Sequence, residues 1–254
     1  MSVYLKSHAI LFVVALSLLV LMSFAVKTYA ESSAILSRPK AVQVIEVLAI
    51  EYPPFTSATL IDSGLSFRLL NGRVAHSSLS INAHFLPSAR AQKQVDSGQW
   101  IASFYPPTSP VPVVYRKIPL SNQPLEIGLF RLLPSDSDQP FRWSQLNELA
   151  GLKVAIGRRS SAGPLSTQLT EAKVQVIETD SLNQGFQLLQ RGRVDAVFAE
   201  KLSGFFTVQL LGLSETQFQF SETVFEQTPI AIWVNTIHPN GRWLIEVLEQ
   251  SRKH

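Results

Sequence analysis

The chain has 254 residues, of which 46% are hydrophobic and 16% are charged, a balance typical of a folded, core-forming protein rather than a disordered one. It contains no cysteine, which excludes disulfides, thiol catalysis and cysteine-ligated zinc. The formal net charge is only +3, so no basic surface of the kind that binds nucleic acid is expected.

The chain begins with an apolar leader. Residues 9–26 carry no charge, Lys6 precedes them, and Ala30 is a small residue suited to a cleavage point. This layout predicts a secretory signal peptide over residues 1–30, with an uncleaved membrane anchor as the alternative, because the apolar run approaches the length of a membrane span. In either case the remainder is exported. A periplasmic location is therefore expected, and residues 31–40 are predicted to be a polar linker.

The first half of the exported chain alternates predicted strands and helices. β-branched or alternating runs predict strands, and runs with a proline start or a glycine end predict helices. In chain order these are a strand at 42–50, a helix at 60–75, a strand at 78–86, a helix at 87–98 and a strand at 100–105. Residues 106–124 are rich in proline, which predicts a loop or an edge segment and not a central strand.

The second half continues the alternation with clearer signals. In chain order the pattern predicts a strand at 125–133, a short helix at 144–151 with Ser144 as N-cap, a strand at 152–157, a turn and helix over 158–172, a strand at 174–179, a helix at 181–192, a strand at 194–200, a helix at 201–212, a strand at 228–235 and a closing helix from Pro239. Strands and helices that alternate in this way indicate βαβ units and a mainly parallel sheet.

A short internal repeat indicates two similar lobes. The spacing G-x-x-x-A-x-F occurs after Gly98 and again after Gly192, each time at the end of a predicted helix. The two copies place Ala102 and Ala196 at equivalent positions of two predicted strands. The strand that carries the second copy ends at Glu200, and open α/β sheets bind ligands at the carboxyl ends of their strands.

Together, the leader and three segments resemble the bacterial extracellular solute-binding proteins of family 3, the amino-acid-binding type. The segments are "EYPPF" (51–55), "LAGLKVAIGRRSSAG" (149–163) and "SLNQGFQLLQRGRVDAVFAE" (181–200). The resemblance implies an α/β, two-lobe periplasmic-binding-protein fold of type II, with two hinge crossings and a ligand cleft between the lobes. It places the first lobe at 41–124 plus 222–254 and the second lobe at 125–221.

The resemblance also suggests ligand-binding residues in the second lobe. Glu200 occupies the place of a family aspartate that accepts the ligand's ammonium group, although an acid that begins the following helix is the alternative. Ser160 and Ser161 lie at a helix start suited to an anion, and Arg158 and Arg159 would strengthen such a site. For the serines the alternative is helix capping, and for the arginines it is a solvated surface.

In the first lobe, Tyr52 and Phe55 are candidates for an aromatic wall against the ligand, with ordinary loop packing as the alternative. The sequence departs from the family where an arginine should bind the ligand carboxylate, because Val114 stands at the expected position. Arg116 is the nearest candidate, and Arg90 is a second one that can equally form a structural ion pair.

No catalytic or metal-binding motif is recognisable, since the five histidines show no metal-like spacing and there is no G-x-S-x-G or P-loop. The sequence therefore predicts a non-enzymatic, monomeric protein without a cofactor. It would bind a small polar ligand, such as an amino acid, and present it to an inner-membrane permease or a sensor. The alternative is an interaction or sensory module with a divergent or empty cleft.

Overall fold

The computed structural model describes residues 42–107, 114–133, 139–158 and 164–251. The predictions for residues 1–30 and 31–40, and for Ser160 and Ser161, concern parts of the chain outside these ranges. Within them, no helix is long and apolar enough to cross a membrane.

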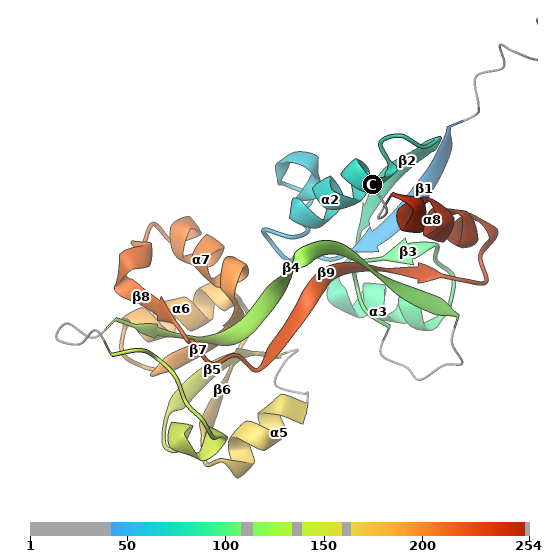
Figure 1. Ribbon diagram of the computed structural model, residues 1–254. Helices are drawn as coiled ribbons and strands as arrows, with labels where there is room; N and C mark the ends of the chain where they lie inside the picture. Colours follow the sequence, from blue (N-terminus) through green and yellow to red (C-terminus); the bar gives the residue numbers. More distant parts are fainter. Residues whose placement is uncertain (1–41, 108–113, 134–138, 159–163, 252–254) are drawn as a thin grey trace, which may run out of the picture. The chain divides into compact units, whose positions relative to one another are not determined.

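The strands form one mixed sheet whose order is β2-β1-β3-β9-β4-β7-β5-β6, with β8 paired to β4 (Figure 1). Their bounds are β1 Gln43–Ala49, β2 Leu79–Phe85, β3 Ala102–Ser103, β4 Tyr115–Leu132, β5 Lys153–Gly157, β6 Gln175–Thr179, β7 Ala196–Glu200, β8 Phe218–Phe220 and β9 Glu226–Asn235. The α-helices are α2 Leu65–Val74, α3 Ser88–Asp96, α5 Pro164–Glu171, α6 Leu182–Gln190, α7 Lys201–Leu210 and α8 Pro239–Gln250, and the short 3₁₀ helices are η1 Ile61–Ser63, η2 Leu146–Leu149 and η3 Glu215–Gln217.

The predicted alternation of strands and helices is confirmed, with shifts at some ends. The strand expected at 100–105 is reduced to β3, and the helix expected after a turn within 158–172 is found as α5. The N-cap of η2 is Gln145 rather than Ser144, because the Glu148 carboxylate closes the capping box on Gln145. The strand β8 was not expected.

The proline-rich segment decides between the two predicted alternatives. Residues 115–124 are not a loop but an edge segment, the first part of β4, which continues to Leu132. In the described part of the chain, β9 is the one strand that pairs with β4 over these residues, and the register shifts between Pro119 and Pro124. Proline lacks an N–H, and a bulge or an unpaired strand side is where this loss costs no ladder bond.

The two copies of the repeat occupy equivalent places. Gly98 and Gly192 have φ of +72° and +64°, which glycine adopts without strain. Ala102 pairs in parallel with β1, and Ala196 pairs in parallel with β5. Each of these strands then has an antiparallel neighbour, β9 for β3 and β4 for β7. The repeat therefore marks the same helix–turn–strand step in two related halves of the sheet.

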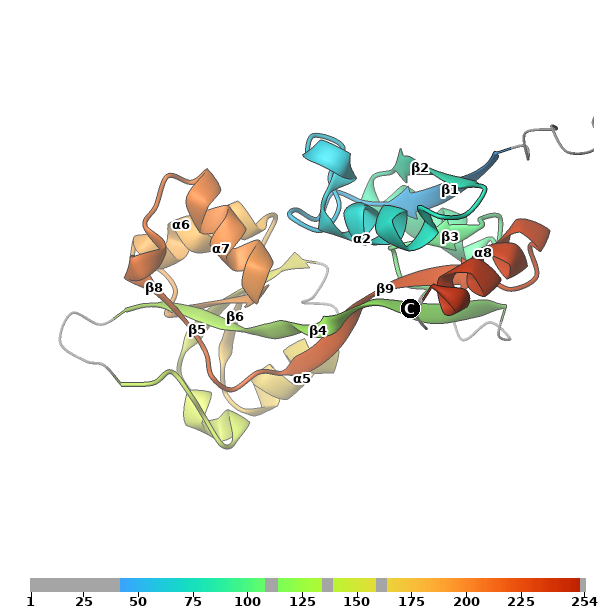
Figure 2. The same cartoon turned by 45° about the horizontal axis from the view of Figure 1, so that its top comes forward.

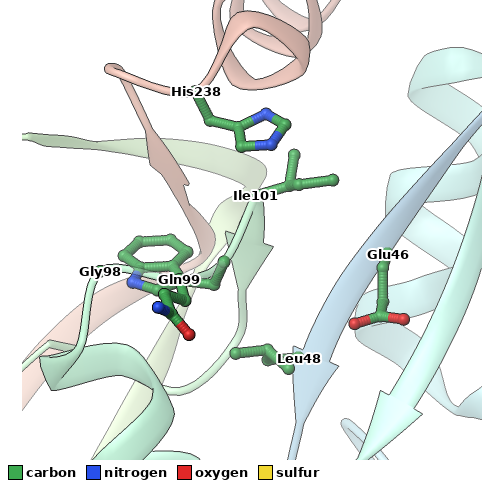
Figure 3. Close-up of a pocket in the computed structure, with 7 residues that line it drawn as sticks. Glu46, Leu48, Gly98, Gln99, Ile101 and His238 are labelled. Atoms are coloured by element: carbon green, nitrogen blue, oxygen red, sulfur yellow. The ribbon is translucent and has the colours of Figure 1, made fainter.

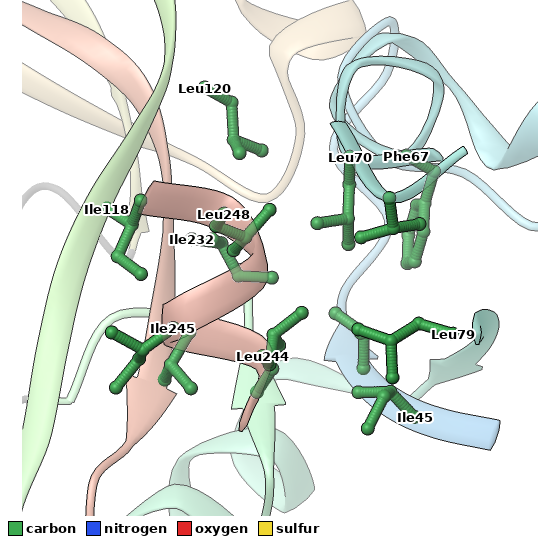
Figure 4. Close-up of a cluster of buried hydrophobic side chains, with 14 of the residues drawn as sticks. Ile45, Phe67, Leu70, Leu79, Ile118, Leu120, Ile232, Leu244, Ile245 and Leu248 are labelled. Carbon is green, nitrogen blue, oxygen red and sulfur yellow. The ribbon is translucent and has the colours of Figure 1, made fainter. Parts of the chain in front are cut away.

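Buried side chains separate the two halves into distinct cores. In the first half, alternate residues of β1 face α2 and α8 on one side and α3 on the other (Figures 1 and 4). In the second half, alternate residues of β5 and β7 face α5 on one side and α6 with α7 on the other (Figure 2). Among the described residues, no buried cluster takes members from both halves, whereas β4 and β9 run through both. We call the halves the first and the second lobe.

Candidate ligand-binding site

The loop after β1, residues 51–55, is held by the start of α2. Its carbonyl groups serve as the cap of this helix: Leu65 N donates to Pro54 O at 3.0 Å, and Ser66 N donates to Phe55 O at 2.9 Å. The first N–H groups of a helix have no partner within the helix, so this arrangement satisfies them without a side-chain cap. The loop is therefore a fixed part of the first lobe.

Gly64 makes this close approach feasible. Its φ is +96°, and a Cβ built on it would lie 2.7 Å from the carbonyl oxygen of Phe55. Any other residue would both strain the backbone and collide with the loop. The glycine lies within the helix predicted over 60–75 and is the point where η1 ends and α2 begins.

Tyr52 and Phe55 lie together in this loop. Their rings stack at 5.6 Å between centroids with 27° between planes. Phe55 is buried, whereas Tyr52 is 42% exposed, so Phe55 supports the tyrosine ring from within and Tyr52 presents a surface. Of the two predicted wall residues, only Tyr52 offers appreciable surface to a bound molecule in this arrangement.

Glu200 ends β7 and forms the N-cap of α7. Its Oε2 accepts from the N–H of Ser203 at 2.8 Å, and the N–H groups of Leu202 and Glu126 also donate to the carboxylate. The residue is buried, with 4% of its surface exposed. Burial raises the pKa of the Glu200 carboxyl, and the hydrogen bonds it accepts oppose that rise. The helix-start role weighed for Glu200 is thus realised, and its described partners are donors of the chain itself.

A further contact links α7 to the loop of the first lobe. The hydroxyl of Ser203 donates to the carbonyl oxygen of Pro53 at 3.0 Å. Beside it, Lys201 Nζ lies 2.7 Å from Glu126 Oε2, and Gln227 Nε2 donates to Glu126 Oε1 at 3.3 Å. Neither Ser203 nor Glu126 was expected from the sequence, because no local pattern indicates which distant carbonyl or strand a helix start will meet.

Arg158 follows β5, at the same end of the sheet as Glu200, because β5 and β7 run parallel. Its guanidinium pairs with Glu178 at 3.1 Å and Asp180 at 2.5 Å, both at the end of β6. The side chain is 71% exposed, so these ion pairs leave much of it open to solvent. Arg158 is therefore held by these ion pairs and largely exposed at this edge. Ser160 and Ser161 lie outside the described residues.

Arg116 lies apart from these residues. It stands near the start of β4, where it pairs with Glu249 of α8 at 2.6 Å between Nη2 and Oε1. Both side chains are largely exposed. Arg90 is an exposed residue of α3. In this arrangement Arg116 joins β4 to α8 within the first lobe, so the guanidinium is engaged there.

A pocket of about 460 Å³ opens elsewhere on the first lobe (Figure 3). It is lined by Glu46, Leu48, Gly98, Gln99, Trp100, Ile101 and His238. These residues precede β3 or flank it at its amino end, whereas the predicted ligand site lies at carboxyl ends of strands. None of the predicted site residues that the structure describes lines it. In the described part of the chain, no group of three His, Cys, Asp or Glu side chains could hold a metal ion.

Solved structures with a similar fold include three amino-acid receptors. They are the GluR0 ligand-binding core from Nostoc punctiforme in complex with L-glutamate (TM-score 0.59, 15% identity, covering 82% of this chain and 93% of that one), holo ArgBP from T. maritima (0.56, 17%, 83% and 89%) and the unliganded, open L-cystine solute receptor of Neisseria gonorrhoeae (0.55, 16%, 84% and 86%). The chain has the two-lobe periplasmic binding protein fold. No protein-family model and no curated protein matches its sequence.

This fold confirms the architecture that the sequence resemblance implied, while identities of 15–17% carry no information about the ligand. In the two-lobe fold of this chain, β4 and β9 are the crossing strands. Tyr52 follows β1, Arg158 follows β5 and Glu200 ends β7, so all three stand at carboxyl ends of parallel strands. Arg116 is the predicted site residue that the fold does not bring to these ends.

Proposed function

We propose that this protein is a periplasmic solute-binding protein that holds a small polar ligand between its two lobes. The observation that carries the proposal is the two-lobe fold, and the positions of Tyr52, Arg158 and Glu200 at carboxyl ends of strands support a ligand site there. Proteins of similar fold solved with L-glutamate and with arginine support an amino acid or a similar molecule as the ligand.

The proposed lobe bounds are 41–124 with 222–254 for the first lobe and 125–221 for the second. The ligand would lie against Tyr52, supported by Phe55, and would meet the 158–163 loop, where Arg158, Ser160 and Ser161 attract an anionic group. Glu200 would contribute at the buried edge of this site. A signal peptide would direct the chain to the periplasm, where it would act as a monomer without a cofactor.

The partner would be an inner-membrane permease or a sensor that distinguishes ligand-bound from ligand-free protein. Binding shifts the balance between lobe arrangements only when the ligand contacts both lobes in one of them. This requirement suits a site shared between Tyr52 and Arg158. No catalytic role is proposed, because the sequence carries no recognisable catalytic motif and the solved structures with a similar fold are ligand-binding proteins.

A second candidate function is an interaction or sensory module whose cleft takes no ligand, held by residues 9–26 if they remain as an anchor. Two observations favour it. The Glu200 carboxylate accepts bonds from the chain itself, and Arg116 pairs with Glu249. These are the two charged groups that the sequence offered for the ammonium and the carboxylate of an α-amino acid.

Thermal unfolding of the purified protein with a panel of amino acids, polyamines, small peptides and organic acids separates the two candidates. A ligand at a hundredfold excess over its dissociation constant stabilises the folded state by about 2.7 kcal/mol. For a protein of this size, the midpoint should rise by about 2–4 °C for each kcal/mol. We expect at least one compound to give such a rise.

Variants then locate the site. Tyr52→Ala should reduce the rise produced by that compound, whereas Ile177→Ala, which shortens an exposed side chain of β6, should not. If the ligand is an amino acid, Arg116→Ala tests whether Arg116 leaves Glu249 and binds the ligand. In that case the variant should show a smaller rise in the unfolding midpoint. A panel without any hit would favour the interaction module.

A further inference from the structure

We propose that the first turn of α7, residues 200–203, is a clasp that ties the second lobe to both crossing strands and to the first-lobe loop. Within this clasp, Ser203 is the positioning residue that sets the balance between lobe arrangements. The inference rests on the proposed function in one respect, because it concerns how the arrangement of the two lobes around the proposed ligand site is regulated. Its evidence is a set of hydrogen bonds that the resemblance to binding proteins did not imply.

The outer arm of the clasp is the bond from the Ser203 hydroxyl to Pro53 O. The carbonyls on either side of Pro53 are already engaged within the first lobe: Tyr52 O accepts from Phe55 N, and Pro54 O accepts from Leu65 N. Pro53 O is therefore presented to the second lobe from a loop that is fixed on both sides. A bond to such a loop restrains the whole lobe rather than a flexible tip.

The inner arm fixes Ser203 in place. Glu200 accepts the N–H of Ser203, and it also accepts the N–H of Glu126 from the crossing strand β4. Ser203 is almost fully buried, with 1% of its surface exposed. The carboxylate thus joins the start of α7 to β4 and holds the Ser203 backbone where its hydroxyl reaches Pro53.

Glu126 also connects the first turn of α7 to β9, the second crossing strand. Its carboxylate pairs with Lys201 of the same α7 turn and accepts from Gln227 of β9. One turn of helix is thereby connected to β4, to β9 and to the loop of the other lobe. Any change in the angle between the lobes has to alter at least one of these contacts, because the crossing strands are where the lobes join.

A single proton makes the clasp reversible. The Ser203 hydroxyl has one proton, which it donates to Pro53 O, and the Glu200 carboxylate lies within its reach as a second acceptor. When the lobes separate, the hydroxyl can turn to Glu200, so no buried donor is left without a partner. Separation then costs at most one ordinary hydrogen bond and not the larger penalty of an unpaired buried donor, which keeps the equilibrium within the range that a ligand can shift.

The test measures lobe separation directly in the full-length chain without added ligand. Because the chain has no cysteine, a single pair of spin labels can be introduced at Lys93→Cys in α3 and Gln168→Cys in α5, both exposed and one on each lobe. Distances between the labels are measured in the parent and in Ser203→Ala. Thr207→Val is the matched control, because Thr207 is a buried hydroxyl one turn along α7 that donates only to Ser203 O within the helix.

We expect Ser203→Ala to shift the ratio of joined to separated lobes by about two- to tenfold toward separation, the effect of one lost hydrogen bond. Ser203→Thr, which restores the hydroxyl, should bring the ratio back. Thr207→Val should match the parent. Lys201→Met removes the ion pair with Glu126 and leaves the buried core unchanged. It should move the ratio of joined to separated lobes toward separation, by a smaller amount than Ser203→Ala.

Identical distance distributions in the parent, Ser203→Ala and Lys201→Met would overturn the clasp. A shift in Thr207→Val equal to that in Ser203→Ala would also overturn it, because the effect would then come from α7 stability alone. These distance measurements need no ligand. A panel that yields no binder would count against the proposed function, whereas the distances report on the clasp whichever way that panel turns out.

Discussion

Glu200 fits two interpretations of its position in the sequence. As a strand-end acid it stands where a ligand would be met, and as an N-cap it accepts the free N–H groups of α7. Its burial and its partners follow from this second role. The neighbouring charges, Lys201 and Glu126, pair with each other, so the carboxylate relies on hydrogen bonds rather than on an opposite charge.

The raised pKa of Glu200 predicts a specific pH dependence of stability. The folded protein binds this proton more tightly than the unfolded chain does, so the contribution of Glu200 to the free energy of unfolding is full below the unfolded pKa of about 4.3. It is lost as the pH rises through the folded-state pKa. The free energy of unfolding of the parent minus that of Glu200→Gln should therefore fall as the pH rises through this window.

Urea unfolding of both proteins between about pH 4 and pH 8 measures this difference. Glu171→Gln, which replaces an exposed acid of α5, is the control for a general effect of removing a negative charge. A difference that rises with pH would mean that the hydrogen bonds to Glu200 outweigh its burial, contrary to the prediction.

At the scale of elements, α7 is placed by a close approach to β4. Gly204 faces Phe130, a fully buried residue whose ring also packs against Phe186, Phe205 and Phe220 at 5.0–5.2 Å between centroids. A Cβ at Gly204 would overlap the Phe130 ring. The small residue thus allows α7 to lie close enough to β4 for Glu200 to reach Glu126.

The same substitution in two helices should therefore have opposite effects. Gly204→Ala should lower the free energy of unfolding by about 1–3 kcal/mol through overpacking against Phe130. Gly72→Ala in α2 should raise it by about 0.5–1 kcal/mol, because nothing lies within 4 Å of the added Cβ and alanine favours a helix. Urea unfolding measures both. A stabilising Gly204→Ala would show that α7 can move away from β4 without loss.

The strand β4 shows what sequence patterns miss at this scale. Leu125–Leu132 reads as a strand by itself, but the prolines before it predict a break. In the structure, the partner β9 extends past the break and pairs with both parts across the register shift. Pairing with a distant segment overrides local propensity here, and no window of neighbouring residues contains that information.

At the scale of the whole molecule, two cores share two strands. β4 contributes Ile118 to the first-lobe core and Leu129 to the second, and β9 pairs with it from Tyr115 to Ile127. Loss of either core would leave half of each crossing strand without its packing. The lobes are therefore coupled in stability, even though their buried clusters are separate.

This coupling predicts one cooperative unfolding transition in calorimetry. Ile232→Ala in the first-lobe core and Leu129→Ala in the second-lobe core should each destabilise the protein by about 2–5 kcal/mol, and both should lower the midpoint of that same transition. Ile61→Ala, at a side chain that is 90% exposed, should leave it unchanged. Two transitions that each respond to only one core variant would contradict the coupling.

The sequence by itself determined the order of strands and helices and the repeated step at Gly98 and Gly192, because these depend on local periodicity and on residues close along the chain. Its resemblance to a known family implied the two-lobe architecture. Only the tertiary structure decided that β4 is continuous, that Arg116 pairs with Glu249 and that Ser203 meets Pro53. Those contacts join segments far apart in sequence, and a side chain's partners are set by packing that its own neighbours do not encode.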